Sequence, residues 1–265
     1  MTRSLLSCSR FGTPSKPAVV FLHGFLGSHT DWRGVIAPLE SSYDLVCFDL
    51  PGHGKSSAVD QSIFHLDNCC VAIADTLADL KITNCSLVGY SMGGRIALQC
   101  VVNIPQLFRA VVLVGAHPGI ESESARLSRL AQDEQLAERM ISMPLSQFVD
   151  EWYQQPLFDS LRDSQEYRDL SARRASGDRE LLALALARFS VGRQRPLWGE
   201  LSKLTIPLGY VAGEHDTKYT AVGRRVVDLC PRAKLHIIPR AGHAVHIEQP
   251  EELSRVIASF LELHK

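Results

Sequence analysis

One short stretch constrains the possible folds of this chain more than any other. Residues 85–89 form a mostly apolar run, and Ser91 follows between Gly89 and Gly93 in a Gly-x-Ser-x-Gly pattern that leads into the helix-favouring residues 95–98. A serine at the tip of a sharp strand-to-helix turn has a strained backbone, and side chains two positions away would collide there. The stretch therefore predicts a strand, a tight turn and a helix, with Ser91 as nucleophile or base. Because the pattern alone also arises by chance in loops, its flanking elements carry the prediction.

The composition favours one large α/β unit and excludes several classes of partner. The chain has 265 residues, of which 45% are hydrophobic, so it can bury a full core. The formal net charge is −1 with dispersed basic residues, which predicts no nucleic-acid partner and no anionic membrane surface. Residues 1–17 lack the apolar centre of a signal peptide, and no later run approaches membrane-spanning length. We expect a cytoplasmic protein, either a monomer or a weak homo-oligomer.

The cysteine pattern predicts neither a disulfide framework nor a metal site. Seven cysteines are scattered through mostly apolar segments, without a Cys-x-x-Cys pair or a Cys/His cluster at zinc spacing. We expect reduced core residues and no bound metal.

Apolar runs alternate with helical patterns along most of the chain. Expected buried strands cover residues 17–23, 43–49, 85–89, 110–115, 206–212 and 235–238, and expected helices cover 62–80, 221–229 and 250–263. This alternation predicts an α/β fold with a mostly parallel central sheet and helices on both faces. We expect the last helix to pack at the edge of the sheet.

Residues 120–199 differ in character, because they contain helical patterns, many arginines and no convincing strand. We expect a helical cap there, inserted into a core formed by residues 1–119 and 200–265. The segment holds an aromatic stretch at 151–158 and two arginine clusters, Arg126/Arg129 and Arg173/Arg174. From composition alone, the arginines are more typical of a solvated helix face, and the aromatic residues are more typical of the interior of the cap.

Three loops, each following a predicted strand, offer Ser91, Asp216 and His243. Ligands of open α/β sheets bind beyond the carboxyl ends of the strands, so these side chains should meet. His243 would take the proton of Ser91, and Asp216 would orient the imidazole and stabilise its positive charge.

Other residues compete for these roles. Glu214 competes with Asp216 for the acid, and the competing histidines are His117, His215 and His246. His243 is favoured because it alone follows the last strand in an Ala-Gly-His turn.

Two further loops support the site. The glycines at 24 and 27 follow the first predicted strand, so a backbone amide near Phe25 is a candidate for half of an oxyanion hole. His53, in the turn at 50–56, suits a structural role better than a catalytic one.

With these motifs in place, the sequence resembles the α/β-hydrolase fold family over essentially its whole length. The matching stretches are residues 21–25, 49–54, 88–95, 117–119, 152–156 and 239–243. Arg95 directly after the serine turn, His-Pro-Gly at 117–119 and Trp-Tyr-Gln-Gln-Pro at 152–156 are similar to the pyruvate-eliminating lyases of menaquinone biosynthesis.

The resemblance implies a lyase that needs no cofactor. Its small-molecule substrate would be a polycarboxylate, a cyclohexene with succinyl, carboxyl and enolpyruvyl-derived groups. The triad would act as base, and the backbone amides of Phe25 and Met92 would hold the developing enolate oxygen. The implied substrate-binding residues are Tyr90, Arg95, Arg129, Trp152, Phe158 and Arg173.

Two points stay open. Arg126 and Arg174 lie close enough in sequence to replace Arg129 and Arg173 in the implied site. The alternative function is a carboxylester or carbon–carbon-bond hydrolase that uses the same triad with an added water. A silent binding protein is disfavoured because all three triad positions are occupied.

Overall fold

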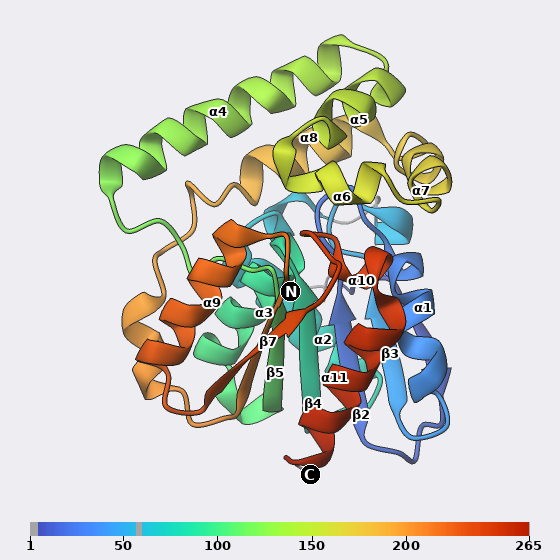
Figure 1. Ribbon diagram of the computed structural model, residues 1–265, viewed down its shortest axis with the longest axis vertical. Coiled ribbons are helices and arrows are strands. Elements are labelled where there is room, and N and C mark those ends of the chain that lie inside the picture. Colours follow the sequence, from blue (N-terminus) through green and yellow to red (C-terminus); the bar gives the residue numbers. More distant parts are fainter. Residues whose placement is uncertain (1–4, 57–59, 265) are drawn as a thin grey trace.

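The computed structural model describes residues 5–56 and 60–264; residues 1–4, 57–59 and 265, which fall in the predicted core ranges, lie outside it. Its described part contains a seven-stranded sheet in the order β1-β3-β2-β4-β5-β6-β7 (Figure 1). The strands are β1 (Cys8–Gly12), β2 (Ala18–Leu22), β3 (Asp44–Phe48), β4 (Cys85–Tyr90), β5 (Phe108–Val114), β6 (Leu208–Gly213) and β7 (Ala233–Ile238). All neighbouring pairs are parallel except β1 with β3. The predicted α/β fold is confirmed.

The strand predictions succeeded where strands are buried on both faces. Every residue of β2, β3, β4 and β6 is buried, which is why these strands appear in the sequence as continuous apolar runs. The edge strand β1 was not predicted because its residues are only half-buried or exposed. It is anchored by Arg10, whose guanidinium donates to both carboxylate oxygens of Asp44 at 2.7 and 2.6 Å.

Helices cover both faces of the sheet (Figure 1). One face packs against α2 (Leu66–Asp79), α3 (Met92–Asn103) and α9 (Thr217–Leu229). The other packs against α1 (Arg33–Ile36), α10 (Val245–Glu248) and α11 (Pro250–Glu262). Short 3-10 turns are η1 (His29–Trp32), η2 (Ala37–Leu39), η3 (Gly54–Ser56), η4 (Gln61–Ile63), η5 (Pro105–Leu107), η6 (Pro156–Phe158) and η7 (Trp198–Lys203).

The expectation that the last helix packs at the sheet edge is wrong. Leu253, Ile257 and Phe260 of α11 are buried in one core with Val19 of β2 and Val112 of β5. An apolar stripe of this kind needs a broad partner, and the open face of parallel strands supplies one.

Five helices between β5 and β6 form a layer above the carboxyl ends of the strands (Figure 1). They are α4 (Glu123–Ser142), α5 (Leu145–Tyr153), α6 (Asp159–Arg162), α7 (Tyr167–Arg174) and α8 (Arg179–Arg188), and we call residues 123–188 the helical layer. The layer has a hydrophobic core of its own that includes Met140, Phe148 and Leu161, joined by Leu26 from the loop after β2. That residues 120–199 act as a separate cap on a core of residues 1–119 and 200–265 stays a prediction.

The remaining expectations concern membranes and cysteines. Among the described residues, no helix combines the length and the apolar character needed to cross a bilayer. The seven cysteines carry free thiols, six of them buried and Cys8 half-buried, which matches their prediction as core residues.

Candidate active site

Ser91 lies at the sharp turn between β4 and α3, with φ of 49° and ψ of −110°. Gly89 and Gly93, two positions to either side, must be glycine because a side chain at either position would collide with the backbone. A Cβ on Gly89 would lie 2.5 Å from the carbonyl oxygen of Gly93, and a Cβ on Gly93 would lie 2.3 Å from that of Leu22. The Gly-x-Ser-x-Gly pattern therefore places this serine in a left-handed conformation at the end of a central strand.

A chain of hydrogen bonds joins the three predicted catalytic side chains. His243 Nε2 lies 3.2 Å from Ser91 Oγ, and His243 Nδ1 lies 2.7 Å from Asp216 Oδ2. If Nδ1–H donates to the carboxylate, Nε2 is free to accept the serine proton. The other oxygen of Asp216 accepts from the backbone N–H of Tyr219 at 3.0 Å, which caps α9 and fixes the carboxylate. The arrangement can remove a proton from Ser91.

The competing residues lie in other environments. Glu214 accepts from the backbone N–H of Arg240 at 2.9 Å, and His215 is exposed. His246 is buried against Tyr90, with ring centroids 4.1 Å apart. The structure thus brings Asp216 rather than Glu214 to the histidine that contacts the serine.

The two predicted oxyanion-hole residues, Phe25 and Met92, line the same cavity as Ser91. Met92 begins α3, where backbone N–H groups have no partner within the helix and the helix dipole favours negative charge. Phe25 lies in the loop after β2. The His53 ring supports this loop, because His53 Nε2 accepts a hydrogen bond from Leu26 N–H at 3.2 Å and His53 Nδ1 lies 2.9 Å from the carbonyl oxygen of Pro51. Burial lowers the pKa of His53 to about 3, so the ring is neutral, as this bonding requires. His53 has the structural role that its position in the sequence suggested.

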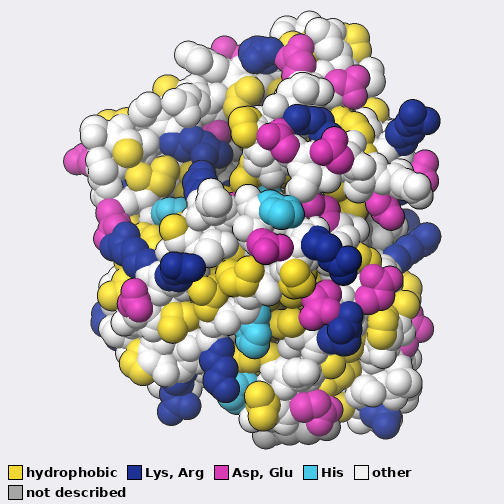
Figure 2. All heavy atoms as spheres, viewed as in Figure 1, with side chains coloured by type: hydrophobic (Ala, Val, Ile, Leu, Met, Phe, Trp, Pro, Cys, Tyr) yellow, Lys and Arg dark blue, Asp and Glu magenta, His cyan; other side chains and the backbone are white. Residues whose placement is uncertain are grey.

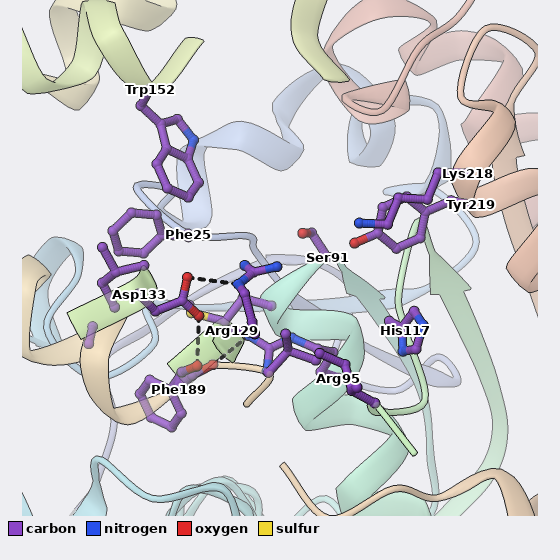
Figure 3. Close-up of a pocket in the computed structure, with 16 residues that line it drawn as sticks. Phe25, Ser91, Arg95, His117, Arg129, Asp133, Trp152, Phe189, Lys218 and Tyr219 are labelled. Atoms are coloured by element: carbon purple, nitrogen blue, oxygen red, sulfur yellow. Dashed lines mark hydrogen bonds and ion pairs between the residues drawn. The ribbon is translucent and has the colours of Figure 1, made fainter. Parts of the chain in front are cut away.

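A cavity of about 220 Å³ opens beside Ser91 (Figure 3). Arg95, Arg129 and Trp152, three of the predicted substrate-binding residues, line it. On the face shown in Figure 2, Lys and Arg side chains gather in a hollow between α4 and α9. The site therefore combines a serine, an imidazole and several cations.

Arg95 has no carboxylate partner among the described residues. Its Nη1 donates to Gln194 Oε1 at 3.2 Å and its Nη2 to the carbonyl of Phe189 at 2.6 Å, both neutral acceptors. Burial, with a further contribution from Arg129, lowers the pKa of Arg95 to about 10, so it remains charged at neutral pH. A desolvated guanidinium without a counter-ion favours binding of an anion.

Arg129 reaches the cavity from α4. Its Nε donates to Asp133 Oδ1 at 2.8 Å, one helical turn away, and Asp133 also accepts from Ser190 Oγ at 2.6 Å. In the described part of the chain, the Nη groups of Arg129 have no hydrogen-bond partner, so they can contact a ligand in the cavity. Asp133 thus orients Arg129 through Nε and leaves its two Nη groups free to donate hydrogen bonds.

A second, smaller cavity of about 30 Å³ also reaches Ser91. Tyr90, Phe158 and Trp152 line it, and the rings of Tyr90 and Phe158 lie 5.2 and 5.9 Å from that of His243. These aromatic side chains give the reacting groups an apolar wall.

Of the two adjacent arginines on α7, the structure brings Arg174 and not Arg173 beside Ser91. Arg173 is exposed and lines a separate cavity with residues of the loops at 26–30 and 52–54. Arg174 lines the small cavity, is buried, and donates to both oxygens of Asp31 at 2.9 and 2.7 Å. Successive side chains on a helix point about 100° apart, so a shift of one residue along α7 decides which of the two arginines faces the site.

Two residues that sequence reasoning missed, Lys218 and Tyr219, also line the larger cavity, together with His117, which the sequence offered only as a competitor for the catalytic histidine. The predicted helix began at residue 221, whereas α9 begins at Thr217, so Lys218 and Tyr219 were assigned to a loop. Their spacing after Asp216 was the available signal, because a residue in the first turn of that helix must lie near the acid.

A serine on a turn between a parallel strand and a helix, hydrogen-bonded to a His-Asp pair on later strand ends, defines an α/β-hydrolase-type enzyme. The model of the alpha/beta hydrolase fold family matches residues 17–250. Relatives called 2-succinyl-6-hydroxy-2,4-cyclohexadiene-1-carboxylate synthase are 37% identical in Escherichia coli, over 96% of each chain, and 37% identical in Enterobacter sp., over 96% of this chain and 95% of the relative. The chain belongs to the α/β-hydrolase fold family and, within it, to the family of these synthases.

Solved structures agree with this placement. MenH from S. aureus superimposes with a TM-score of 0.92 at 28% identity, covering 97% of this chain and 98% of that one. An esterase from Thermogutta terrifontis has a TM-score of 0.82 at 22% identity, over 98% of this chain and 94% of that one, which shows a shared fold alone.

Proposed function

We propose that this protein is a lyase of menaquinone biosynthesis. It eliminates pyruvate from 2-succinyl-5-enolpyruvyl-6-hydroxy-3-cyclohexene-1-carboxylate to give 2-succinyl-6-hydroxy-2,4-cyclohexadiene-1-carboxylate. The observation that carries the proposal is a cavity lined by Arg95 and Arg129 that opens onto Ser91, itself in contact with His243. The names of the relatives point to the same reaction.

The first step is removal of the ring proton next to the succinyl ketone. As His243 Nε2 accepts the hydroxyl proton, Ser91 Oγ takes the ring proton, and the bonding electrons move onto the ketone oxygen. Asp216 stabilises the resulting imidazolium across the 2.7 Å hydrogen bond. The amides of Phe25 and Met92 hold the enolate oxygen, with the helix dipole of α3 behind Met92.

In the second step the enolate electrons return and form a double bond between ring carbons 2 and 3, the existing ring double bond shifts from carbons 3 and 4 to carbons 4 and 5, and the carbon–oxygen bond between carbon 5 and the pyruvyl group breaks. The departing enolate of pyruvate takes up the proton held by His243, and pyruvate leaves. No electrons pass to an external acceptor, so the reaction requires no redox cofactor.

The substrate has three carboxylates, and their charges must be balanced as water leaves the cavity. Arg95 and Arg129 are fixed planar cations that suit carboxylates. Tyr90, Trp152 and Phe158 pack against the ring, and Arg174, rather than the exposed Arg173, supports the small cavity. A neutral ester would make no use of this charge, which favours the lyase over the carboxylester or carbon–carbon-bond hydrolase with the same triad.

A direct assay tests the function. Purified protein should release pyruvate from the cyclohexene substrate, and it should hydrolyse simple aryl esters far more slowly. Fast ester turnover without pyruvate release would favour the hydrolase.

A second measurement tests the role of Ser91 as a base. Rapidly quenched enzyme, analysed by intact-mass spectrometry with the true substrate, should carry no covalent adduct. An adduct that is present in the wild type and absent in Ser91→Ala would indicate a nucleophilic mechanism instead.

A further inference from the structure

Lys218 lies in the first turn of α9, two residues after Asp216, and lines the cavity that contains Ser91, Arg95 and Arg129. Figure 3 shows its side chain beside Tyr219, with the ammonium group directed into the cavity. The nitrogen lies 5.4 Å from the centre of the Tyr219 ring. The cavity is therefore bordered by cations from three elements, α3, α4 and α9.

No carboxylate of the described residues forms an ion pair with Lys218, and the nearby acids are already engaged. Asp216 accepts from His243 and from the backbone of Tyr219. Asp133 accepts from Arg129 and Ser190. Within the described lining, three cations thus face one carboxylate, and that carboxylate is bound to one of them.

The cationic groups of this cavity affect one another. Lys218 is an exposed residue; partial burial of its ammonium group and then Arg129 lower its pKa, with Asp216 opposing them. Burial and then Lys218 lower the pKa of His117 to about 4, so this histidine is neutral and adds no charge of its own. Positive charge is concentrated in this cavity without a counter-ion, so the cations repel one another. A bound anion would offset that repulsion.

We propose that Lys218 binds one carboxylate of the substrate and thereby completes a set of three cations with Arg95 and Arg129. The identity of the tricarboxylate rests on the proposed function. The need for an anion rests on the cavity itself. An ammonium group acts as a point charge without the guanidinium fork, so Lys218 suits a carboxylate that is bound through one oxygen.

The test compares three variants in the pyruvate-release assay. Lys218→Met keeps much of the length and removes the charge, whereas Lys218→Arg keeps the charge. Arg224→Gln is the matched control, because Arg224 is an exposed residue of the same helix, does not line the cavity, and its replacement removes the same charge. All variants should melt within a few degrees of the wild type.

We expect Lys218→Met to raise KM about tenfold or more with a much smaller change in kcat, the pattern for lost substrate binding. Lys218→Arg should recover most of this loss, and Arg224→Gln should match the wild type. A KM for Lys218→Met equal to that of Arg224→Gln would overturn the assignment.

A binding measurement separates this inference from the proposed function. Citrate, a stable tricarboxylate, is titrated into wild type and Lys218→Met by calorimetry, and we expect about tenfold weaker binding to the variant. Equal affinities, or no binding to either protein, would overturn carboxylate binding by Lys218. Wild-type protein that releases no pyruvate would refute the proposed reaction, and the citrate comparison would still decide the role of Lys218.

Discussion

The loops of the sheet and the helical layer contribute to one cavity in different ways. Ser91, Asp216 and His243 follow β4, β6 and β7, so the register of the parallel strands fixes their positions. Arg129 and Trp152 instead belong to helices that pack mainly on a core of their own. A buried ion pair, Arg174 with Asp31, crosses from this layer to the 3-10 turn η1. The sheet thus supplies the chemistry, and the layer supplies much of the recognition.

The largest effects should come from the sheet side. Ser91→Ala, His243→Ala and Asp216→Asn should each lower kcat by ~10³-fold or more, with little change in melting temperature. Double variants should be scarcely worse than the worse single variant, because the three side chains act as one unit. The measurement is single-turnover pyruvate release. Multiplicative losses in Ser91/His243 double variants would show that the two residues work independently.

Breaking the ion pair tests how the layer is held. Arg174 and Asp31 have side chains only 6% and 1% exposed. Arg174→Met leaves the Asp31 carboxylate buried without its cation, so we expect a loss of about 3–5 kcal/mol in the free energy of unfolding. The additional change Asp31→Asn should restore part of that loss. Urea denaturation gives both values.

An exposed pair is the matched control for this experiment. Arg193 Nη2 lies 2.6 Å from Glu134 Oε1, and the two side chains are 39% and 46% exposed. Arg193→Met should therefore lower the free energy of unfolding far less than Arg174→Met does. Equal effects of Arg174→Met and Arg193→Met would mean that the buried pair does not hold the layer.

Substitution of the two arginines in the larger cavity compares the sheet with the helical layer directly. Arg95 lies on α3, which packs on the sheet, and Arg129 lies on α4 of the layer. Replacing either with Ala should cost about 2–5 kcal/mol in transition-state stabilisation, the range for a desolvated charge pair that loses one partner. Lysine should recover only part of the loss. The measurement is kcat/KM for pyruvate release, with a neutral aryl ester as control. An equal loss on the ester would count against carboxylate binding.

The predictable parts of the fold are those in which a local sequence pattern is compatible with a single structure. The continuous apolar runs of β2, β3 and β4 identify buried strands, and Gly-x-Ser-x-Gly identifies the turn at Ser91. The edge strand β1 gives no such signal, because all of its residues are half-buried or exposed. The location of α11 on a face rather than an edge depends on which surface the rest of the chain leaves open.

The site was predictable where it depends on strand ends and less so where it depends on helix register. Asp216 and His243 follow strands directly, so their meeting with Ser91 follows from the parallel topology. The choice between Arg173 and Arg174 depends on the rotation of α7, which the sequence does not specify. Lys218 was missed because α9 begins at Thr217, four residues before the expected start of the helix.

The smallest expected effect concerns His246, which lies under the small cavity close to the ion pair that holds the layer. Both of its ring nitrogens are buried without a hydrogen-bond partner in the described residues, and the ring packs between Trp32 and Tyr90. Burial lowers the pKa of His246 from 6.5 to about 3, with Asp31 opposing and Arg174 adding to the shift. Above pH 6.5 both the folded and the unfolded states hold this ring neutral, so it makes no contribution to pH dependence there. Below that pH the unfolded state binds a proton that the folded state refuses, so stability falls as pH falls towards 3.

His246→Phe should therefore flatten the acid side of the stability curve. The variant loses no hydrogen bond and keeps an aromatic ring between Trp32 and Tyr90, so at pH 7.5 it should be as stable as the wild type or slightly more so. At pH 5.5, one unit below the ordinary histidine pKa, its advantage should grow by about 1.4 kcal/mol, the free energy that corresponds to one pKa unit. Urea denaturation at the two pH values gives the difference, and the exposed His65→Gln serves as the control substitution. If wild type and His246→Phe lose stability in parallel between pH 7.5 and 5.5, His246 is protonated in the folded protein, and its surroundings stabilise the imidazolium.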